Sequence, residues 1–288
     1  MPLVNLTPIL KAAREGHYAV GAFNIVDYNS MLAVVRAAEE LEAPVIVQTS
    51  VKTVVRWGHG PLVEWARQIA GDSPVPVALH LDHCRDVDYC KSCIEAGWTS
   101  VMIDGSREPY GKNLAMTRQV VEAAAPEGVS VEAELGQIRG VEDDIEVSEE
   151  EAGLADPDKA VEFCEGLGLA AFAPAIGTAH GVYKGEPKVA FDRLEEIARR
   201  TGLPIALHGG TGLSDDVFQR CIELGCAKVN ISTQLKYAFI DGFCDFHAEH
   251  RQYSPLKVIA AQFERVKREM ADNIERFGSA GKASEVEV

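Results

Sequence analysis

The stretch VALHLDHCRD, residues 77–86, begins as an apolar run and ends in His80, Asp82, His83 and Cys84. Buried imidazoles and carboxylates cost free energy unless they are paired or bound to a metal. The stretch therefore predicts either a core strand with a few satisfied polar groups or one half of a metal site.

Similar apolar runs recur along the whole chain, each followed by an amphipathic segment with helical spacing. The runs cover residues 18–25, 43–50, 76–83, 99–106, 129–136, 170–177, 203–210 and 226–233. Asn29 and Ser214 are the expected N-caps of two of the helices. Eight strands, each followed by a helix, predict an α/β fold, a (β/α)8 TIM barrel that forms one domain over residues 1–288. An open doubly wound sheet usually carries a glycine-rich fingerprint after its first strand, and AFNIVDYNS, residues 22–30, has none.

Two segments depart from this rhythm. Residues 136–160 form a long, acidic, glycine-containing connection, which predicts a mobile loop at the active site. From about residue 254 to 288 the pattern predicts a C-terminal extension of two extra helices and a short polar tail.

Composition excludes several classes of protein. A formal net charge of −16 argues against binding of nucleic acid or anionic membranes through the overall field. We find no run of 18 apolar residues that would span a membrane and no signal-peptide pattern at the N-terminus. Seven irregularly spaced cysteines predict reduced thiols in a cytoplasmic protein rather than a disulfide framework.

Histidines stand at the carboxyl ends of three predicted strands, where barrels place their functional groups. His83 ends the third strand, His180 follows the sixth and His208 ends the seventh. Each one alone fits a hydrogen-bonded histidine at a strand end. Three imidazoles that converge on one mouth, with a fourth position open, predict a catalytic zinc site.

Asp82 stands directly before His83, although a regular strand sends adjacent side chains to opposite faces. Both can reach one site only if the strand ends there and the chain bends. A carboxylate beside a dication is well placed for proton transfer. The alternative is that Asp82 caps the next helix.

Further acids follow on the fourth and fifth strands, and Ser106 lies two residues after Asp104. Asp104, Glu132 and Glu134 can orient the histidines or serve as alternative metal ligands. Charge pairing with lysines or arginines inside the barrel is the other interpretation.

Small and hydroxyl residues follow the last two strands, at the place where barrels often bind phosphate on exposed N–H groups. The predicted phosphate-binding residues are Gly209, Gly210, Thr211, Asn230, Ser232 and Thr233, completed by Gly181 and Lys184 after the sixth strand. Local N–H groups and a lysine would hold an anion despite the acidic exterior.

Seven motifs in this chain resemble those of the class II, metal-dependent ketose-bisphosphate aldolases, the family of fructose- and tagatose-1,6-bisphosphate aldolases. The motifs are GAFN (21–24), LDHC (81–84), SVMIDGS (100–106), SVEAELGQ (130–137), GTAHGVYKGEPK (177–188), LHGGTGL (207–213) and KVNIST (228–233). They stand in the family's order and cover nearly the whole predicted barrel.

The resemblance implies a lyase that splits or forms a ketose 1,6-bisphosphate, fructose 1,6-bisphosphate first, through a zinc-stabilised enediolate. The products would be dihydroxyacetone phosphate and glyceraldehyde 3-phosphate. It implies a zinc ion held by the three histidines, and a homodimer or homotetramer. It also implies a monovalent cation, Na+ or K+, near Gly181.

The resemblance also implies roles for single residues. Asp82 matches the catalytic acid/base, and Glu142 a mobile glutamate that moves the proton next to the carbonyl. Glu134 matches an acid that joins the metal shell, and Asp104 an acid near a second metal position. Asn24 matches a substrate contact, and Gly181, Gly209, Thr211, Asn230, Ser232 and Thr233 match the pocket for the phosphate of dihydroxyacetone phosphate.

Two departures leave the substrate open. SPLK (254–257) puts Leu256 where the family's arginine grips the distal phosphate. The possible replacements are Lys236, Lys257, Lys52 and Arg56. Alternatively, an aldolase or epimerase would act on a ketose phosphate without a distal phosphate. Ser232 stands where several fructose-bisphosphate enzymes have an acid, and Lys236 resembles the tagatose-type pattern, whereas VYKGEPK resembles fructose-type members. A non-catalytic barrel would have no reason to keep the histidines, Asp82 and Glu142 together.

Overall fold

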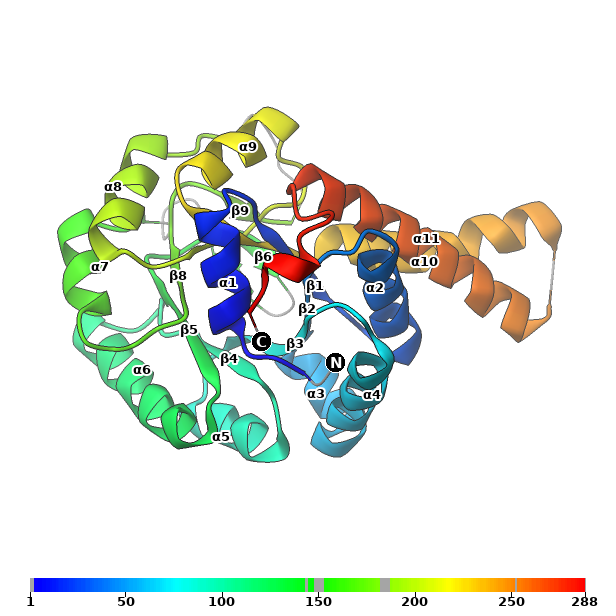
Figure 1. Ribbon diagram of the computed structural model, residues 1–288, viewed down its shortest axis with the longest axis horizontal. Helices are drawn as coiled ribbons and strands as arrows, with labels where there is room; N and C mark the ends of the chain where they lie inside the picture. The colour runs from blue at the N-terminus through cyan, green and yellow to red at the C-terminus, as the bar shows by residue number, and fades with distance from the viewer. Residues whose placement is uncertain (1–2, 143–144, 148–152, 182–186, 252, 288) are drawn as a thin grey trace.

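The computed structural model describes residues 3–142, 145–147, 153–181, 187–251 and 253–287. Parallel strands close into a barrel in the order β1-β11-β10-β8-β5-β4-β3-β2 (Figure 1). They are β1 (Val20–Asn24), β2 (Val45–Ser50), β3 (Val77–Cys84), β4 (Ser100–Ile103), β5 (Ser130–Leu135), β8 (Ala171–Pro174), β10 (Ile205–Leu207) and β11 (Cys226–Ile231). The predicted TIM barrel and each of its eight strands are confirmed.

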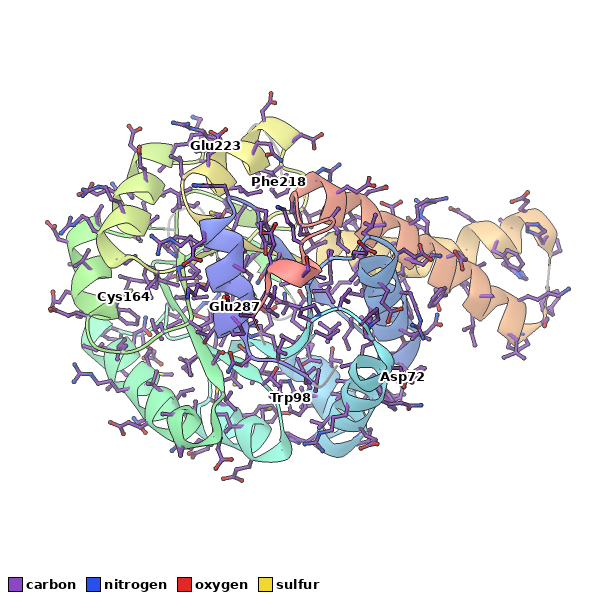
Figure 2. The ribbon with its side chains drawn as sticks, in the orientation of Figure 1. Asp72, Trp98, Cys164, Phe218, Glu223 and Glu287 are labelled. Atoms are coloured by element: carbon purple, nitrogen blue, oxygen red, sulfur yellow. The ribbon has the colours of Figure 1, made fainter. Side chains whose placement is uncertain are left out.

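Helices surround the barrel as an outer layer. They are α2 (Tyr28–Glu40), α3 (Val51–Trp57), α4 (His59–Asp72), α5 (Val87–Ala96), α6 (Tyr110–Ala124), the 3-10 turn η1 (Ala125–Glu127), α7 (Pro157–Cys164), α8 (Phe191–Thr201) and α9 (Asp215–Glu223). Trp98, Cys164 and Phe218 are buried among strands and helices, whereas Asp72 and Glu223 are exposed (Figure 2).

The predicted caps hold for one helix and fail for the other. Ser214 caps α9, its hydroxyl accepting from the Val217 N–H at 3.4 Å. Asp27 rather than Asn29 caps α2. The Asp27 carboxylate accepts from the Ser30 N–H, and the Ser30 hydroxyl accepts from the Asp27 N–H, which satisfies two helix-end donors at once.

One end of the barrel is closed by α1 (Leu6–Glu15). Its buried face packs on an inner wall made largely of alanine. The small side chains leave room for the helix, so this end of the barrel is a packed core. Polar side chains gather instead at the carboxyl ends of the strands. The inner alanines are Ala22, Ala78, Ala171, Ala173, Ala206 and Ala227.

The acidic connection 136–160 is not simply a loop, because part of it forms strands. β6 (Arg139–Glu142) pairs antiparallel with β7 (Ile145–Val147) and parallel with β9 (Ala179–His180). Gly140 lies opposite His180 in this small sheet. The backbone that carries Glu142 is therefore held in register with a predicted metal ligand.

A helical arm, α10 (Thr233–His250) with α11 (Pro255–Arg276), projects from the barrel (Figure 1). The prediction of two helices after residue 254 is wrong. Among the described residues after that point, α11 is the one α-helix, and its partner is the helix of the last barrel strand, which runs on without a break. The tail packs back through the turn η2 (Ala283–Glu285), where the Ala283 N–H donates to the Glu42 carbonyl.

Among the described residues, no helix combines the length and apolar character that crossing a bilayer requires.

Candidate active site

The end of β3 makes the bend that Asp82 and His83 require. Leu81 packs in the helix-facing core, so Asp82, one residue on, points into the barrel. The pairing with β4 shifts register between Leu81 and Cys84, and His83 has a φ of 45°. This left-handed backbone, which costs a non-glycine residue about 1–2 kcal/mol, turns both side chains to one site.

Asp82 is not a helix cap, so that alternative is wrong. The cap of α5 is Asp86, whose carboxylate accepts from the Tyr89 N–H at 2.9 Å.

Three buried histidines meet at the barrel mouth, as predicted. One nitrogen from each of His83, His180 and His208 lies within 4.8 Å of the other two. The His208 Nδ1 and His83 Nε2 atoms are 2.9 Å apart. The His83 ring centroid is 5.0 Å from that of His180 and 4.6 Å from that of His208.

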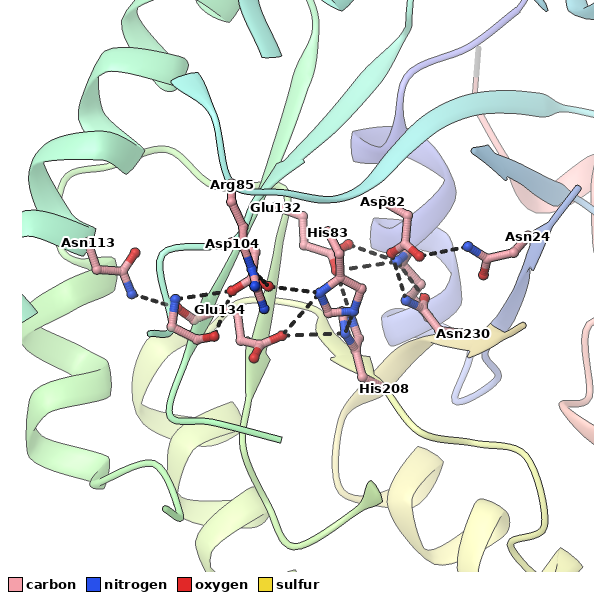
Figure 3. Close-up of polar contacts among 12 residues, drawn as sticks. Asn24, Asp82, His83, Arg85, Asp104, Asn113, Glu132, Glu134, His208 and Asn230 are labelled. Carbon is pink, nitrogen blue, oxygen red and sulfur yellow. Dashed lines mark hydrogen bonds and ion pairs between the residues drawn. The ribbon is translucent and has the colours of Figure 1, made fainter. Parts of the chain in front are cut away.

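This donor set fits zinc. His83 Nδ1 lies 3.2 Å from Asp104, and His208 Nε2 lies 2.8 Å from Glu132 (Figure 3). A carboxylate accepts the N–H of one ring nitrogen and leaves the lone pair of the other for a metal, as is typical of metal-binding histidines. Burial lowers the pKa of His208, and burial together with His83 lowers the pKa of His180 to about 3. Neutral imidazole is the form that binds metals.

A second set of donors overlaps the first. His83, Asp104 and Glu134 also bring ligand atoms within 4.8 Å of one another. Glu134 Oε2 lies 3.6 Å from His208 Nδ1, and Ser106 fixes Asp104 by donating its hydroxyl at 2.6 Å. Burial and the neighbouring Asp104 raise the pKa of Glu134 well above its usual range. A cation bound at this position would offset both the burial of Glu134 and its repulsion by Asp104.

Glu132 combines both interpretations, because besides its contact with His208 it takes part in charge pairing inside the barrel. Its Oε2 lies 3.0 Å from the ammonium of Lys228, and both side chains are fully buried. His80 shares this interior, with Nδ1 2.8 Å from the Ser100 hydroxyl. Burial and Lys228 lower the pKa of His80 to about 3. His80 therefore belongs to the core strand of the first interpretation, whereas His83 lies in the donor cluster that the second interpretation predicts.

Asp82 is held by two amides. Asn24 Nδ2 donates to one carboxylate oxygen at 2.7 Å and Asn230 Nδ2 to the other at 3.2 Å (Figure 3). Each amide oxygen accepts in turn, from Gln48 at 2.6 Å and from Lys228 at 2.6 Å. Sequence reasoning missed Gln48 and Lys228. The one feature of the sequence that could have pointed to them is that each stands two positions before another polar residue on a buried strand.

All the predicted phosphate-binding residues except Lys184 line one hollow, with about 200 Å³ of empty volume. The Ser232 hydroxyl has no hydrogen-bond partner among the described residues, which leaves it available to a ligand. Gly209 has a φ of 69°, and a Cβ there would lie 2.4 Å from the Ala179 carbonyl oxygen. The lining residues are His180, Gly181, Gly209, Gly210, Thr211, Asn230, Ser232 and Thr233.

Other predicted residues lie elsewhere or fall outside the description. Lys236 stands in the first turn of α10, where its N–H donates to the Ser232 carbonyl. Leu256 is 78% exposed on the arm. Lys184 lies outside the described residues. Glu142 ends β6, and its side chain is not among those described.

Comparisons with known proteins agree with this geometry. A family model described as fructose-bisphosphate aldolase class-II matches residues 4–282. The chain is 41% identical over 290 residues to a Geobacillus stearothermophilus protein named fructose-bisphosphate aldolase, with 99% of this chain and 100% of that protein covered. It is 40% identical over 293 residues to a Bacillus subtilis protein named probable fructose-bisphosphate aldolase, with 98% and 100% covered. The YdjI aldolase from Escherichia coli K12 superposes with a TM-score of 0.87 at 31% identity, covering 98% of this chain and 99% of that one.

Proposed function

Because the chain belongs to the class II fructose-bisphosphate aldolase family, we propose that it cleaves and forms fructose 1,6-bisphosphate. The enzyme is an aldehyde-lyase, and its products would be dihydroxyacetone phosphate and glyceraldehyde 3-phosphate. The observation that carries this proposal is the position of Asp82, held by two amides beside three buried histidines.

His83, His180 and His208 would hold the zinc ion, and Glu134 would join them as a further ligand. Asp104 and Glu132 would orient two of the rings through the contacts described above. When bound, zinc acts as a Lewis acid that polarises the ketose carbonyl and stabilises negative charge developing on the ketose.

Asp82 would accept the C4 hydroxyl proton as the C3–C4 bond breaks, and return it in synthesis. Burial raises the pKa of this carboxyl, but His83, Lys228, His208 and His80 together lower it by more. The carboxylate is therefore ionised and ready to act as a base. Glu142 would move the proton at the carbon next to the carbonyl.

The hollow beside His180 would bind the phosphate of dihydroxyacetone phosphate. Ser232 and Thr233 offer hydroxyls, and the glycines offer backbone N–H groups. Lys184 and Lys236 would add positive charge, and a Na+ or K+ ion would sit on carbonyls near Gly181. Asn24 would contact the sugar as well as Asp82.

Leu256 favours a second candidate, because a leucine cannot hold the distal phosphate. That candidate is cleavage of a ketose 1-phosphate. Cleavage of tagatose 1,6-bisphosphate, which differs from fructose 1,6-bisphosphate in its stereochemistry at C4, is a variant of the first candidate. The test is zinc-supplemented cleavage of fructose 1,6-bisphosphate, tagatose 1,6-bisphosphate and fructose 1-phosphate, following dihydroxyacetone phosphate, with a chelator control. Preference for the first sugar supports the proposal, and equal cleavage of the monophosphate would refute it.

The arm would form the contact of a homodimer or homotetramer. Tyr237, Ile240 and Phe243 are exposed on α10 at helical spacing, and Leu256 and Ile259 on α11. Exposed apolar residues gathered in this way mark interaction surfaces. Ile240→Glu should dissociate the assembly in light scattering, and an unchanged mass would exclude the arm. The seven free cysteines support a reducing, cytoplasmic location.

A further inference from the structure

We propose that Lys228 is a positioning residue that aims two parts of the active site at once, the ring of His208 and the amide of Asn230. This inference rests on the proposed function, because it concerns the orientation of the metal site and of Asp82. The mechanism above uses Lys228 for no chemical step.

The lysine is fully buried, and its ammonium contacts two residues, Asn230 and Glu132. Its ammonium lies 2.6 Å from Asn230 Oδ1, 3.0 Å from Glu132 Oε2 and 3.3 Å from Glu132 Oε1. The contacts to Asn230 Oδ1 and Glu132 Oε1 are hydrogen bonds that the ammonium donates, and the contact to Glu132 Oε2 is an ion pair. Lys228 therefore acts through Glu132 and Asn230 rather than on the substrate.

The contact with Asn230 decides which end of its amide faces Asp82. An ammonium can only donate, so the amide oxygen must face Lys228. The amide nitrogen is then left to donate to Asp82 Oδ1, at 3.2 Å. Gln48 does the same for Asn24, whose Nδ2 donates to the other oxygen of Asp82.

The contact with Glu132 decides which nitrogen of His208 faces the metal site. The ammonium holds the carboxylate so that Glu132 Oε1 lies 2.8 Å from His208 Nε2. A carboxylate in that place accepts the Nε2–H and leaves the Nδ1 lone pair on the side of His83, whose Nε2 is 2.9 Å away. One buried cation thus connects a metal ligand with the proposed base.

Two variants separate this role from a purely structural one. Lys228→Met keeps length and removes the charge, but it leaves Glu132 as a buried carboxylate without its cation. Lys228→Met combined with Glu132→Gln removes both charges, which usually restores stability. Val131→Ala is the matched control, because Val131 precedes Glu132 on β5 and packs in the helix-facing core.

Three quantities are measured on the folded full-length protein: thermal stability, zinc affinity in competition with a chromogenic chelator, and kcat at saturating zinc. We expect Lys228→Met to lose about 10- to 100-fold in zinc affinity, as for other residues that orient metal ligands. The double variant should regain stability and zinc affinity, because a glutamine oxygen can still accept from His208. Its kcat at saturating zinc should stay at least tenfold low, because Asn230 remains unheld.

Proton exchange into dihydroxyacetone phosphate provides a further readout. It needs the metal and Glu142 but not Asp82, so the double variant should keep most of it. Equal losses of exchange and cleavage would overturn the connection from Lys228 to Asp82. Zinc affinity and kcat at the levels of Val131→Ala would overturn the whole proposal. If wild-type protein cleaved none of the three sugars, the proposed function would fail, while the zinc affinities would still decide the orientation of His208.

Discussion

Replacing Asp82 by asparagine tests the proposed chemistry most directly, because the change keeps shape and removes the base. General acid–base catalysis contributes about 10²- to 10⁴-fold, so the barrier should rise by about 3–5 kcal/mol. The asparagine cannot accept from both amides, because it has a single oxygen where the carboxylate has two. Either Asn24 or Asn230 then faces an NH2 group, which should cost stability by about 1–3 kcal/mol.

The metal should be unaffected, because the hydrogen bonds that hold Asp82 come from the amides of Asn24 and Asn230. We therefore expect kcat for cleavage to fall at least 100-fold while zinc stoichiometry stays that of wild type. Metal analysis of the purified variant, with dihydroxyacetone phosphate release at saturating zinc, provides both numbers. A kcat within tenfold of wild type would refute the role of Asp82, and loss of zinc would show that it acts through the metal.

Three other perturbations have distinct expected outcomes. Asp104→Asn turns an NH2 group toward His83 Nδ1, because Ser106 donates twice to the oxygen on the other side of Asp104. Zinc affinity should therefore fall about 10- to 100-fold, measured by chelator competition, and an unchanged affinity would count against this orientation. Removing the metal with EDTA should reversibly abolish cleavage and lower Tm. Zinc at a thousandfold excess over its Kd contributes about 4 kcal/mol to the free energy of unfolding. An unchanged Tm would argue against the three-histidine site. Gly209→Ala puts a Cβ 2.4 Å from the Ala179 carbonyl oxygen at positive φ, so KM for the sugar phosphate should rise and stability fall by about 1–3 kcal/mol. Gly128→Ala, at a φ of 66° with no atom within 4 Å, is its control, and equal effects of the two variants would mean that only backbone strain is being measured.

The strands were predictable because each is a short apolar run with polar residues at one end, a pattern that depends on nearby sequence alone. The three histidines followed from the rule that barrel strands carry function at their carboxyl ends. The cap of α2 was misplaced because Asn29 and Asp27 are equally good capping residues. Asp27 prevails through its reciprocal bond with Ser30, which depends on backbone geometry.

Lys228 escaped prediction for a different reason. A lysine in a strand ordinarily indicates an exposed face, and its burial is tolerable only because Glu132 lies opposite, 96 residues earlier in the chain. Spacing along one strand does not reveal such a partner. The arm was misjudged because nothing in residues 233–250 marks where the helix of the last barrel strand ends and an extension begins.

The charges at the barrel mouth imply an order of binding. Four buried carboxylates, those of Asp82, Asp104, Glu132 and Glu134, meet there, and Lys228 is the one fully buried lysine or arginine that the described residues contribute. Lys228 pairs with Glu132 and Arg85 lies 3.5 Å from Asp104, while the whole chain carries a further excess of acid, with a net charge of −16. A sugar phosphate approaching the metal-free site is therefore repelled, and a dication reverses the local balance.

Metal should consequently bind first, and dihydroxyacetone phosphate should bind the chelator-treated protein at least tenfold more weakly than the zinc-loaded protein. Equilibrium dialysis at two salt concentrations measures this. The difference should persist at the higher salt, because charges buried at the mouth are screened far less than surface charges. Equal affinities with and without zinc would mean that the hydroxyls and N–H groups of the hollow hold the phosphate alone.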